Sequence, residues 1–216
     1  LSNALTIVPN ILHHSCLLGE KSAMHSNSNT IIILHGLLGS SKNFQSWSKL
    51  LQSKVGLGYD IVCMDLRNHG RSHYSPLHSD LNYDQMAEDV IHTINLLGIS
   101  RAHVIGHSMG GKVAAALALK RKMIKQCQLL SLTILDISPI AYSRNDFQSV
   151  IETVDILKNI SSNFADPFIE KSDIIKLIDN TITDGSLRNF ILSNLQASNS
   201  KNQKFRWSFD IHNIHK

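Results

Sequence analysis

The sequence has few cysteines and no long apolar run. Its 216 residues include three cysteines, Cys16, Cys63 and Cys127, which are widely separated and form no Cys-x-x-Cys pair. An odd number of isolated cysteines argues against a disulfide framework and against metal binding, and a reducing compartment is the simplest interpretation. No apolar stretch approaches the ~18 residues that span a bilayer. These absences exclude a small disulfide-rich protein and predict no membrane span.

A concentration of charge of one sign is also lacking. The formal net charge is +4, and the one tight basic cluster is Lys120-Arg121-Lys122. This cluster falls where a helix is expected to end, and cations there complement the helix dipole. No aromatic residues interleave with it, so we expect no nucleic-acid partner. With 43% hydrophobic residues, the chain has the length and composition of a globular protein with one good core.

The chain does contain an alternation of strand-like and helix-like segments. Continuous apolar runs, typical of strands buried on both faces, occur at Thr30–Gly36, Tyr59–Asp65, Ala102–Gly106 and Leu129–Asp136, with weaker candidates at Leu5–Val8 and His13–Leu18. Helical spacing follows at Asn43–Ser53, Asn82–Leu97 and Met109–Lys122. From about Ala141 to Asn202 we expect helices and polar connectors without another strand. The alternation predicts an α/β fold with a mostly parallel sheet and crossover helices.

One short motif is typical of a nucleophilic serine. Gly106-His107-Ser108-Met109-Gly110 is a Gly-x-Ser-x-Gly pattern between a strand-like run and an Ala/Leu-rich helical run. Glycines two positions either side of Ser108 allow a tight turn with the hydroxyl at its apex. The pattern also recurs by chance, but the flanking strand and helix favour a nucleophile over a structural Ser-Gly turn.

An oxyanion hole is expected beside Ser108. The helix that begins near Met109 directs free amide groups toward the serine. A second donor should come from the loop after an earlier strand. Gly36 follows such a strand directly, so the amide of Leu37 is the natural donor.

Three histidines are expected near this site without acting as the base. His107 adjoins Ser108 along the chain, so it points away from the hydroxyl and forms a wall of the substrate pocket. His35 and Gly36 are also expected to line the pocket, with His35 hydrogen-bonded at the end of its strand. His69 is a loop residue that could line the entrance.

Several segments together resemble the α/β-hydrolase family. "HGLLGSSKNF", "DLRNHGRS", "GHSMGGKVA" and "LDISP" occur in the order and spacing of that family, and "LRNFILSNL" followed by "FRWSFD" resembles a lid segment. The detailed match is to the abhydrolase domain-containing protein 11 group and its bacterial short-chain esterase relatives. The resemblance implies the α/β-hydrolase fold, a helical lid after the sixth strand, hydrolysis of acyl esters or thioesters, and no metal or organic cofactor. Animal members are mitochondrial, so we expect a mitochondrial location if the protein is eukaryotic and a cytoplasmic one otherwise.

The acid of a catalytic triad is expected downstream of Ser108, because this fold orders the triad as Ser, acid, His. Asp136 stands at the carboxyl end of the predicted sixth strand, where such sheets place catalytic groups. The alternative is a carboxylate that holds the following "SPI" turn by accepting its amide hydrogens. Asp65 ends another strand similarly, and we expect it to pair with Arg67 or Arg71 instead of serving in catalysis.

The base is harder to place. Only His212 and His215 follow Ser108, and both stand among the last five residues. The resemblance places the base after an eighth strand, and neither a seventh nor an eighth strand is visible here. We therefore expect the last two strands and the catalytic histidine to be missing from this chain. On its own it would then be a poor hydrolase with an unprotected sheet edge.

Together, these features predict an incomplete α/β-hydrolase core over residues 1–140 and a helical lid over residues 141–216. The expected function is that of a serine hydrolase for small acyl esters or thioesters, with Ser108 and Asp136 catalytic and Leu37 and Met109 at the oxyanion hole. The alternative is a non-catalytic binding or regulatory short form that retains the pocket. The oligomeric state stays open. Phe147, Phe164, Phe168 and Leu192 are expected to shape the acyl pocket.

Overall fold

A mostly parallel sheet organises the first two thirds of the chain. The computed structural model describes residues 11–18, 29–56, 58–72, 82–162, 169–197 and 204–214, so the expected strand at Leu5–Val8 lies outside the described residues. The main sheet contains β1 (His14–Leu17), β2 (Asn29–Leu34), β3 (Tyr59–Met64), β4 (Arg101–His107) and β5 (Gln128–Leu135). Their order is β1-β3-β2-β4-β5, and only the pair β1 and β3 is antiparallel. The prediction of a mostly parallel sheet is confirmed.

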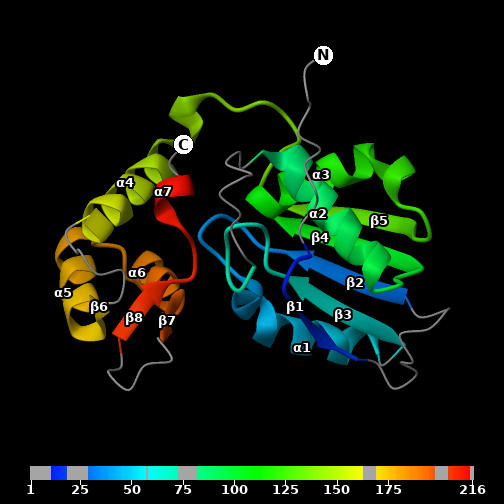
Figure 1. Cartoon of the computed structure of the whole chain (residues 1–216), viewed down its shortest axis with the longest axis horizontal. Coiled ribbons are helices and arrows are strands. Elements are labelled where there is room, and N and C mark those ends of the chain that lie inside the picture. Colours follow the sequence, from blue (N-terminus) through cyan, green and yellow to red (C-terminus); the bar gives the residue numbers. More distant parts are fainter. Residues whose placement is uncertain are drawn as a thin grey trace, which may run out of the picture.

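Crossover helices cover both faces of the sheet (Figure 1). α1 (Gln45–Val55) lies on one face, whereas α2 (Tyr83–Leu96) and α3 (Met109–Leu119) pack together on the other. The inward stripe of α2 contains Met86, Val90 and Ile94, as the helical spacing predicts. β2 and β3 are buried over nearly their whole length, because helices cover them on both sides, and this burial accounts for their continuous apolar sequence.

The basic cluster lies just beyond the end of α3, as expected. Lys120 forms ion pairs with Glu88 at 2.9 Å and Asp84 at 3.5 Å, both on α2. Lys120, the first residue of the basic cluster, therefore links α3 to α2. Over the described part of the chain, no helix combines the length and the apolar character that crossing a membrane would require.

The chain after β5 forms a second layer, which we call the lid (residues 141–214). Its helices are α4 (Gln148–Ser162), α5 (Lys171–Thr181), α6 (Gly185–Ser193) and α7 (Ile211–Ile214). It also contains β6 (Ile169–Glu170), β7 (Leu195–Ala197) and β8 (Lys204–Trp207), antiparallel in the order β6-β8-β7. The expectation of a lid region without strands is therefore wrong. Strands of two to four residues are too short to show the alternation by which a strand is recognised in sequence.

The lid lies beyond the carboxyl ends of the parallel strands (Figure 1). It has an apolar core of its own, which includes Leu157, Ile178, Ile191 and Phe209. Leu38, from the loop after β2, belongs to the same cluster. The lid therefore packs directly on the edge of the sheet where the predicted site residues stand.

Candidate active site

Ser108 occupies a strained turn between β4 and α3. Its backbone angles are φ 51° and ψ −117°, and a non-glycine residue in such a rare region costs about 1–3 kcal/mol. Its N–H donates to the carbonyl oxygen of Leu135 at 2.9 Å, which extends the pairing of β4 with β5 to the turn. A sharp turn of this kind presents the side chain at the carboxyl edge of the sheet.

Gly106 and Gly110 make this turn possible because they let backbone segments touch. A Cβ on Gly106 would lie 2.2 Å from the carbonyl oxygen of Gly110, and a Cβ on Gly110 would lie 2.4 Å from that of Leu34. Both obstacles are backbone atoms, so rotation of a side chain would not relieve the clash.

We expect Gly106→Ala to lower the free energy of unfolding by about 3 kcal/mol or more, at the upper end of overpacking costs. The matched control is Gly58→Ala, because a Cβ at Gly58 would have nothing within 4 Å, and its effect should stay within about 0.5 kcal/mol. Urea denaturation of both variants measures the difference. Equal stabilities would contradict the packing described for the turn.

The loop after β2, residues 36–39, lies against Ser108. A Cβ on Gly36 would be 3.3 Å from the Cβ of Ser108, so glycine permits the close approach. The N–H of Gly39 donates to the carbonyl oxygen of Gly36 at 3.1 Å, which closes the turn. In the described part of the chain, the amides of Leu37 and Met109 have no hydrogen-bond partner. These two N–H groups are free to bind an oxygen atom of a ligand.

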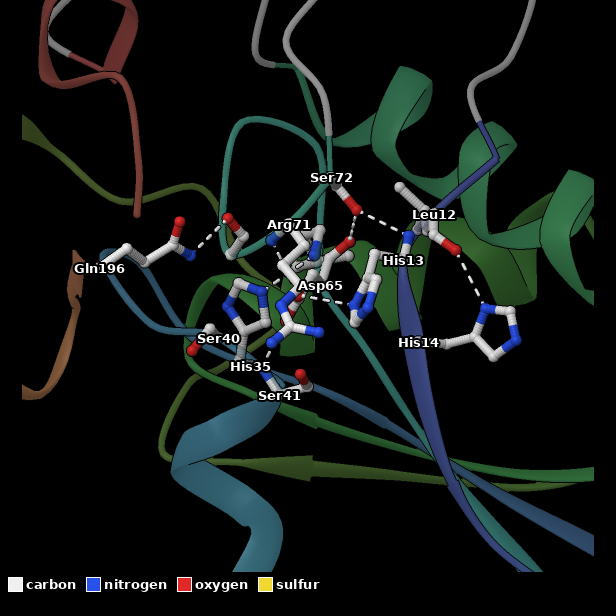
Figure 2. Close-up of polar contacts among 12 residues, drawn as sticks. Leu12, His13, His14, His35, Ser40, Ser41, Asp65, Arg71, Ser72 and Gln196 are labelled. Atoms are coloured by element: carbon white, nitrogen blue, oxygen red, sulfur yellow. Dashed lines mark hydrogen bonds and ion pairs between the residues drawn. The ribbon is translucent and has the colours of Figure 1, made fainter. Parts of the chain in front are cut away.

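Asp65 organises the loop after β3, which we call the β3 loop (residues 65–72). Its carboxylate lies between this loop, β1 and the turn before α1, as Figure 2 shows. Oδ1 accepts the N–H of Ser41 at 2.6 Å, while Oδ2 accepts the N–H of Arg71 at 2.9 Å and lies 3.1 Å from Nδ1 of His13. Burial raises the pKa of Asp65, but the hydrogen bonds from Ser41 and Arg71 outweigh it and hold the pKa below its usual value.

The expected ion pair between Asp65 and Arg67 or Arg71 is wrong. Arg67 turns instead to α2, where its Nε and Nη2 donate to the two carboxylate oxygens of Asp89 at 2.7 and 2.8 Å. Arg71 reaches Asp65 through its backbone N–H. The loop is tight enough to aim amides at the carboxylate because Gly70 takes φ 60°, and a Cβ there would lie 2.2 Å from Cγ of Asp65.

His35 and His69 are buried side by side, with ring centroids 5.2 Å apart. Nδ1 of His35 bonds the carbonyl oxygen of Gly36 at 2.8 Å, and its Nε2 accepts the N–H of Leu66 at 2.9 Å. Nδ1 of His69 bonds the carbonyl oxygen of Arg67 at 2.9 Å, and its Nε2 accepts a backbone N–H at 3.2 Å. A carbonyl only accepts and an amide N–H only donates, so both rings are neutral with hydrogen on Nδ1. Neither ring has a nitrogen left to take a proton from a serine.

Both rings resist protonation. Burial lowers the pKa of His35. Burial and the neighbouring His35 ring lower the pKa of His69 to about 3, although the Arg67 carbonyl and Asp65 oppose this shift. The unfolded chain takes up protons on these histidines below a pH of about 6.5, whereas the folded protein does not.

The stability should therefore fall as the pH drops below about 6.5, with a slope of about 1.4 kcal/mol per pH unit from each neutral buried histidine. The contribution of His69 is fully present above that pH and is lost as the pH approaches about 3. Urea denaturation at pH 7, 6 and 5 measures the slope, and His69→Gln should make it shallower. Parallel slopes for the wild type and this variant would contradict the assignment.

His107 and Asp136 face each other at the ends of β4 and β5. Nε2 of His107 lies 3.7 Å from Oδ2 of Asp136, and the two side chains are 41% and 83% exposed. The sequence left open that Asp136 accepts amide hydrogens of the turn that follows it. In the described residues, the N–H of Ser138 in that turn donates to the hydroxyl of Tyr142 instead, at 2.9 Å. Asp136 is thus an exposed carboxylate at the sheet edge.

A cavity of about 660 Å³ lies between the sheet edge and the lid, within the size range of small-molecule sites. It brings together all the expected site residues except Asp136, whose neighbour Ile137 lines it instead. The lining includes His35, Gly36, Leu37, His107, Ser108 and Met109 from the core, and Phe147, Val150, Ile151, Leu187 and Phe190 from the lid. In the described ranges, no group of His, Cys, Asp or Glu side chains is arranged to hold a metal ion.

The expected lid residues of the acyl pocket are partly corrected. Phe147 lines the cavity, but Leu192 packs against the core of the lid, and Phe190 lines the cavity in its place. Phe164 and Phe168 lie outside the described residues. The same is true of His215 and of the side chain of His212.

Two cavity residues, Lys112 and Tyr142, escaped the sequence analysis. Nζ of Lys112 donates to the carbonyl oxygen of Ile140 and lies 4.5 Å from the centroid of the Tyr142 ring. These contacts anchor the start of the lid to α3. One signal could have found Lys112: it follows Ser108 by four residues on a predicted helix, and residues at this spacing share a face.

The fold and the serine turn define the class of protein, and comparison with known proteins agrees. A family model described as "alpha/beta hydrolase fold" matches residues 29–179. The chain therefore belongs to the α/β-hydrolase family, as its motifs predict.

The relatives include esterases and lipases. Over 196 residues the chain is 32% identical to the sn-1-specific diacylglycerol lipase ABHD11 of Danio rerio, a match that covers 87% of this chain and 55% of that lipase. Over 118 residues it is 36% identical to the esterase YbfF of Escherichia coli K12, which covers 55% of this chain and 42% of the esterase. The chain thus spans about half the length of the curated relatives it matches. Its predicted resemblance to these two groups is confirmed.

A solved structure shows the same arrangement. A marine microorganism esterase superposes with a TM-score of 0.75 and 27% identity, covering 95% of this chain and 70% of the esterase. Nearly the whole chain, lid included, therefore has a counterpart in that protein.

Proposed function

We propose that this protein is a serine hydrolase that acts on small acyl esters or thioesters. The observation that carries the proposal is the strained turn at Ser108, which faces a cavity of about 660 Å³. The unpartnered amides of Leu37 and Met109 flank this serine. The names of the relatives, a diacylglycerol lipase and an esterase, support an ester as the class of substrate.

In the proposed reaction, Oγ of Ser108 attacks the acyl carbon while its proton passes to a histidine that acts as general base. The carbonyl oxygen becomes an oxyanion, which accepts hydrogen bonds from the N–H groups of Leu37 and Met109. The histidine then gives its proton to the departing alcohol or thiol. Water hydrolyses the acyl-enzyme in a second half-reaction that uses the same groups.

The base in this proposal is a histidine outside the described residues, and the protein is proposed to be active, in place of the missing histidine and weak hydrolysis expected from the sequence. His35 and His69 have both nitrogens engaged by backbone groups, and His107 faces Asp136. Asp136 is the proposed acid, because it is an exposed carboxylate at the sheet edge beside the serine turn.

The lid supplies the proposed acyl pocket. Phe147, Val150, Ile151 and Phe190 line the cavity on its lid side, and apolar walls of this kind favour an acyl chain over a charged group. Most polar lining residues come from the core, including His35, His107 and Ser108, whereas the lid adds Tyr142, Ser143 and Thr153. An ester is therefore proposed to bind with its carbonyl toward the core and its acyl chain toward the lid.

The test combines covalent labelling with turnover. A fluorophosphonate probe should modify Ser108, as located by peptide mass spectrometry, and the protein should hydrolyse p-nitrophenyl acetate, p-nitrophenyl butyrate and an acyl thioester. Turnover with a label at another residue would overturn the proposal. The absence of both turnover and labelling would also overturn the proposal, and it would favour a binding protein that retains the pocket.

A further inference from the structure

The β3 loop (residues 65–72) touches both the lid and the turn that carries the proposed oxyanion donor Leu37. Three consecutive residues, Arg67, Asn68 and His69, are almost fully buried, at 1%, 3% and 0% exposure. Burial of three polar side chains in a loop calls for specific partners, because an unpaired buried polar group is costly. Arg67 binds Asp89 of α2. The other two side chains point to different parts of the molecule.

His69 holds the loop after β2. Its Nε2 accepts the N–H of Leu38 at 3.2 Å, while its Nδ1 is held by the carbonyl oxygen of Arg67 at 2.9 Å. Leu38 takes φ 60°, a conformation that a leucine adopts only when its surroundings impose it. The bond to His69 occupies the amide of Leu38 and leaves the preceding amide, that of Leu37, free to face a ligand.

Asn68 holds the lid. Its Nδ2 donates to the carbonyl oxygen of Asp210 at 3.1 Å, and its Oδ1 accepts the N–H of Asp210 at 3.1 Å. One side chain therefore satisfies both backbone groups of a lid residue that is 142 positions away in the sequence. The backbones of His69 and Phe209 form a bridge next to it.

The lid also packs on the same turn directly. Leu38 belongs to the apolar cluster that contains Phe209 and Ile211, and Leu37 packs against that cluster. The segment 209–211 thus contacts the β3 loop through Asn68 and shares one apolar cluster with Leu38 of the oxyanion turn. The position of the lid and the conformation of the oxyanion turn therefore depend on the same group of contacts.

We propose that His69 is a positioning residue of the oxyanion hole, and that Asn68 makes this positioning depend on the seated lid. The proposal rests on the proposed function, because it assigns Leu37 as an oxyanion donor. His69 also lines the cavity, but both of its ring nitrogens are bonded to backbone groups, so it is assigned no proton transfer. It acts by fixing the amide of Leu38, and through it the direction of the neighbouring N–H of Leu37. Asn68, the adjacent residue, ties the loop that carries His69 to Asp210.

The first experiment compares His69→Gln with His69→Asn. Glutamine reaches far enough for its Oε1 to replace Nε2 as acceptor for Leu38, whereas asparagine is too short and retains only a group that can bond the Arg67 carbonyl. For p-nitrophenyl butyrate, kcat of His69→Asn should fall roughly 10- to 100-fold, the scale of a misplaced oxyanion donor, with little change in KM. His69→Gln should keep most of kcat.

Amide hydrogen exchange of the intact protein supplies a readout that needs no turnover. Peptides that cover residues 36–39 should exchange faster in His69→Asn than in the wild type, and close to the wild-type rate in His69→Gln. Equal exchange and equal kcat in the two variants would overturn the assignment. A loss of activity through KM with kcat unchanged would also overturn it, because misplacing an oxyanion donor acts on kcat.

The second experiment tests the link to the lid with Asn68→Gly, which removes the carboxamide and accepts the φ of 64° at this position. The matched control is Gln196→Ala, which removes another lid-to-loop hydrogen bond, from Nε2 of Gln196 to the carbonyl oxygen of Gly70 at 3.0 Å. Asn68→Gly should accelerate exchange at residues 36–39 and lower kcat, whereas Gln196→Ala should leave both near wild type. The same response in both variants would refute the specific role of Asn68.

The two levels of proposal fail in different ways. A wild-type protein without hydrolysis would overturn the proposed function, and the exchange difference between His69→Asn and His69→Gln would still test the positioning of Leu38. Full hydrolysis by His69→Asn would leave the proposed function standing and remove His69 from the oxyanion turn.

Discussion

Ser108→Ala should lower kcat for ester hydrolysis by about 10⁴-fold or more and abolish fluorophosphonate labelling, because the proposed reaction runs through an acyl intermediate on this oxygen. The substitution removes one oxygen from a side chain that lines a cavity. It leaves Gly106 and Gly110, which shape the turn, unchanged. Hydrolysis of p-nitrophenyl butyrate with purified protein, together with thermal unfolding, measures activity and fold separately.

The matched control for this variant is Ser131→Ala. Ser131 is an exposed residue on β5, the strand next to that of the nucleophile, and its hydroxyl bonds only the half-buried His103 ring at 2.8 Å among the described contacts. This control should keep the activity of the wild type. Retention of most activity in Ser108→Ala would show that another group forms the covalent bond or that water attacks directly, and the nucleophile assignment would be wrong.

Arg67→Ala should lower the free energy of unfolding by about 3–5 kcal/mol, the usual cost of leaving one charge of a buried pair without its partner. The side chains of Arg67 and Asp89 are 1% and 0% exposed, and Nε of Arg67 lies 2.7 Å from Oδ2 of Asp89. Nη1 also donates to Oε1 of Gln85 at 3.0 Å. Urea denaturation at neutral pH measures the loss.

An exposed ion pair provides the comparison. Arg188 and Asp179 lie 3.6 Å apart in the lid, with side chains 32% and 51% exposed, so Arg188→Ala should cost no more than about 1 kcal/mol. The double variant Arg67→Met with Asp89→Leu should recover much of the loss, because it removes both buried charges. Similar costs for Arg67→Ala and Arg188→Ala would contradict the buried pair as a stabilising contact.

The features that the sequence predicts best are those that neighbouring residues define. The turn at Ser108 depends on Gly106 and Gly110, which stand two positions away, so a five-residue pattern suffices to predict it. The parallel strands show as continuous apolar runs because helices bury them on both faces. Short lid strands such as β7 carry no comparable pattern, and the sequence analysis missed them.

The partners of Asp65 show where local reasoning fails. The nearest opposite charges along the chain, Arg67 and Arg71, suggest an ion pair, yet the carboxylate binds the backbone N–H groups of Ser41 and Arg71. Backbone amides are present at every residue but proline. The sequence therefore does not indicate which backbone N–H groups will bind the carboxylate, because this depends on the path of the loop in the folded structure.

By itself, the sequence determined the class of fold, the order of strands and helices in the core, and the serine turn, because each depends on residues within one or two turns of chain. Only the folded structure decided the hydrogen bonds and protonation of His69, the pairing of Arg67 with Asp89, and the two hydrogen bonds between Asn68 and the backbone of Asp210. Their partners lie 31, 22 and 142 residues away. Contacts over such separations form only where packing of the whole core brings two segments together, and the hydrogen-bonding needs of buried groups then select the pairs.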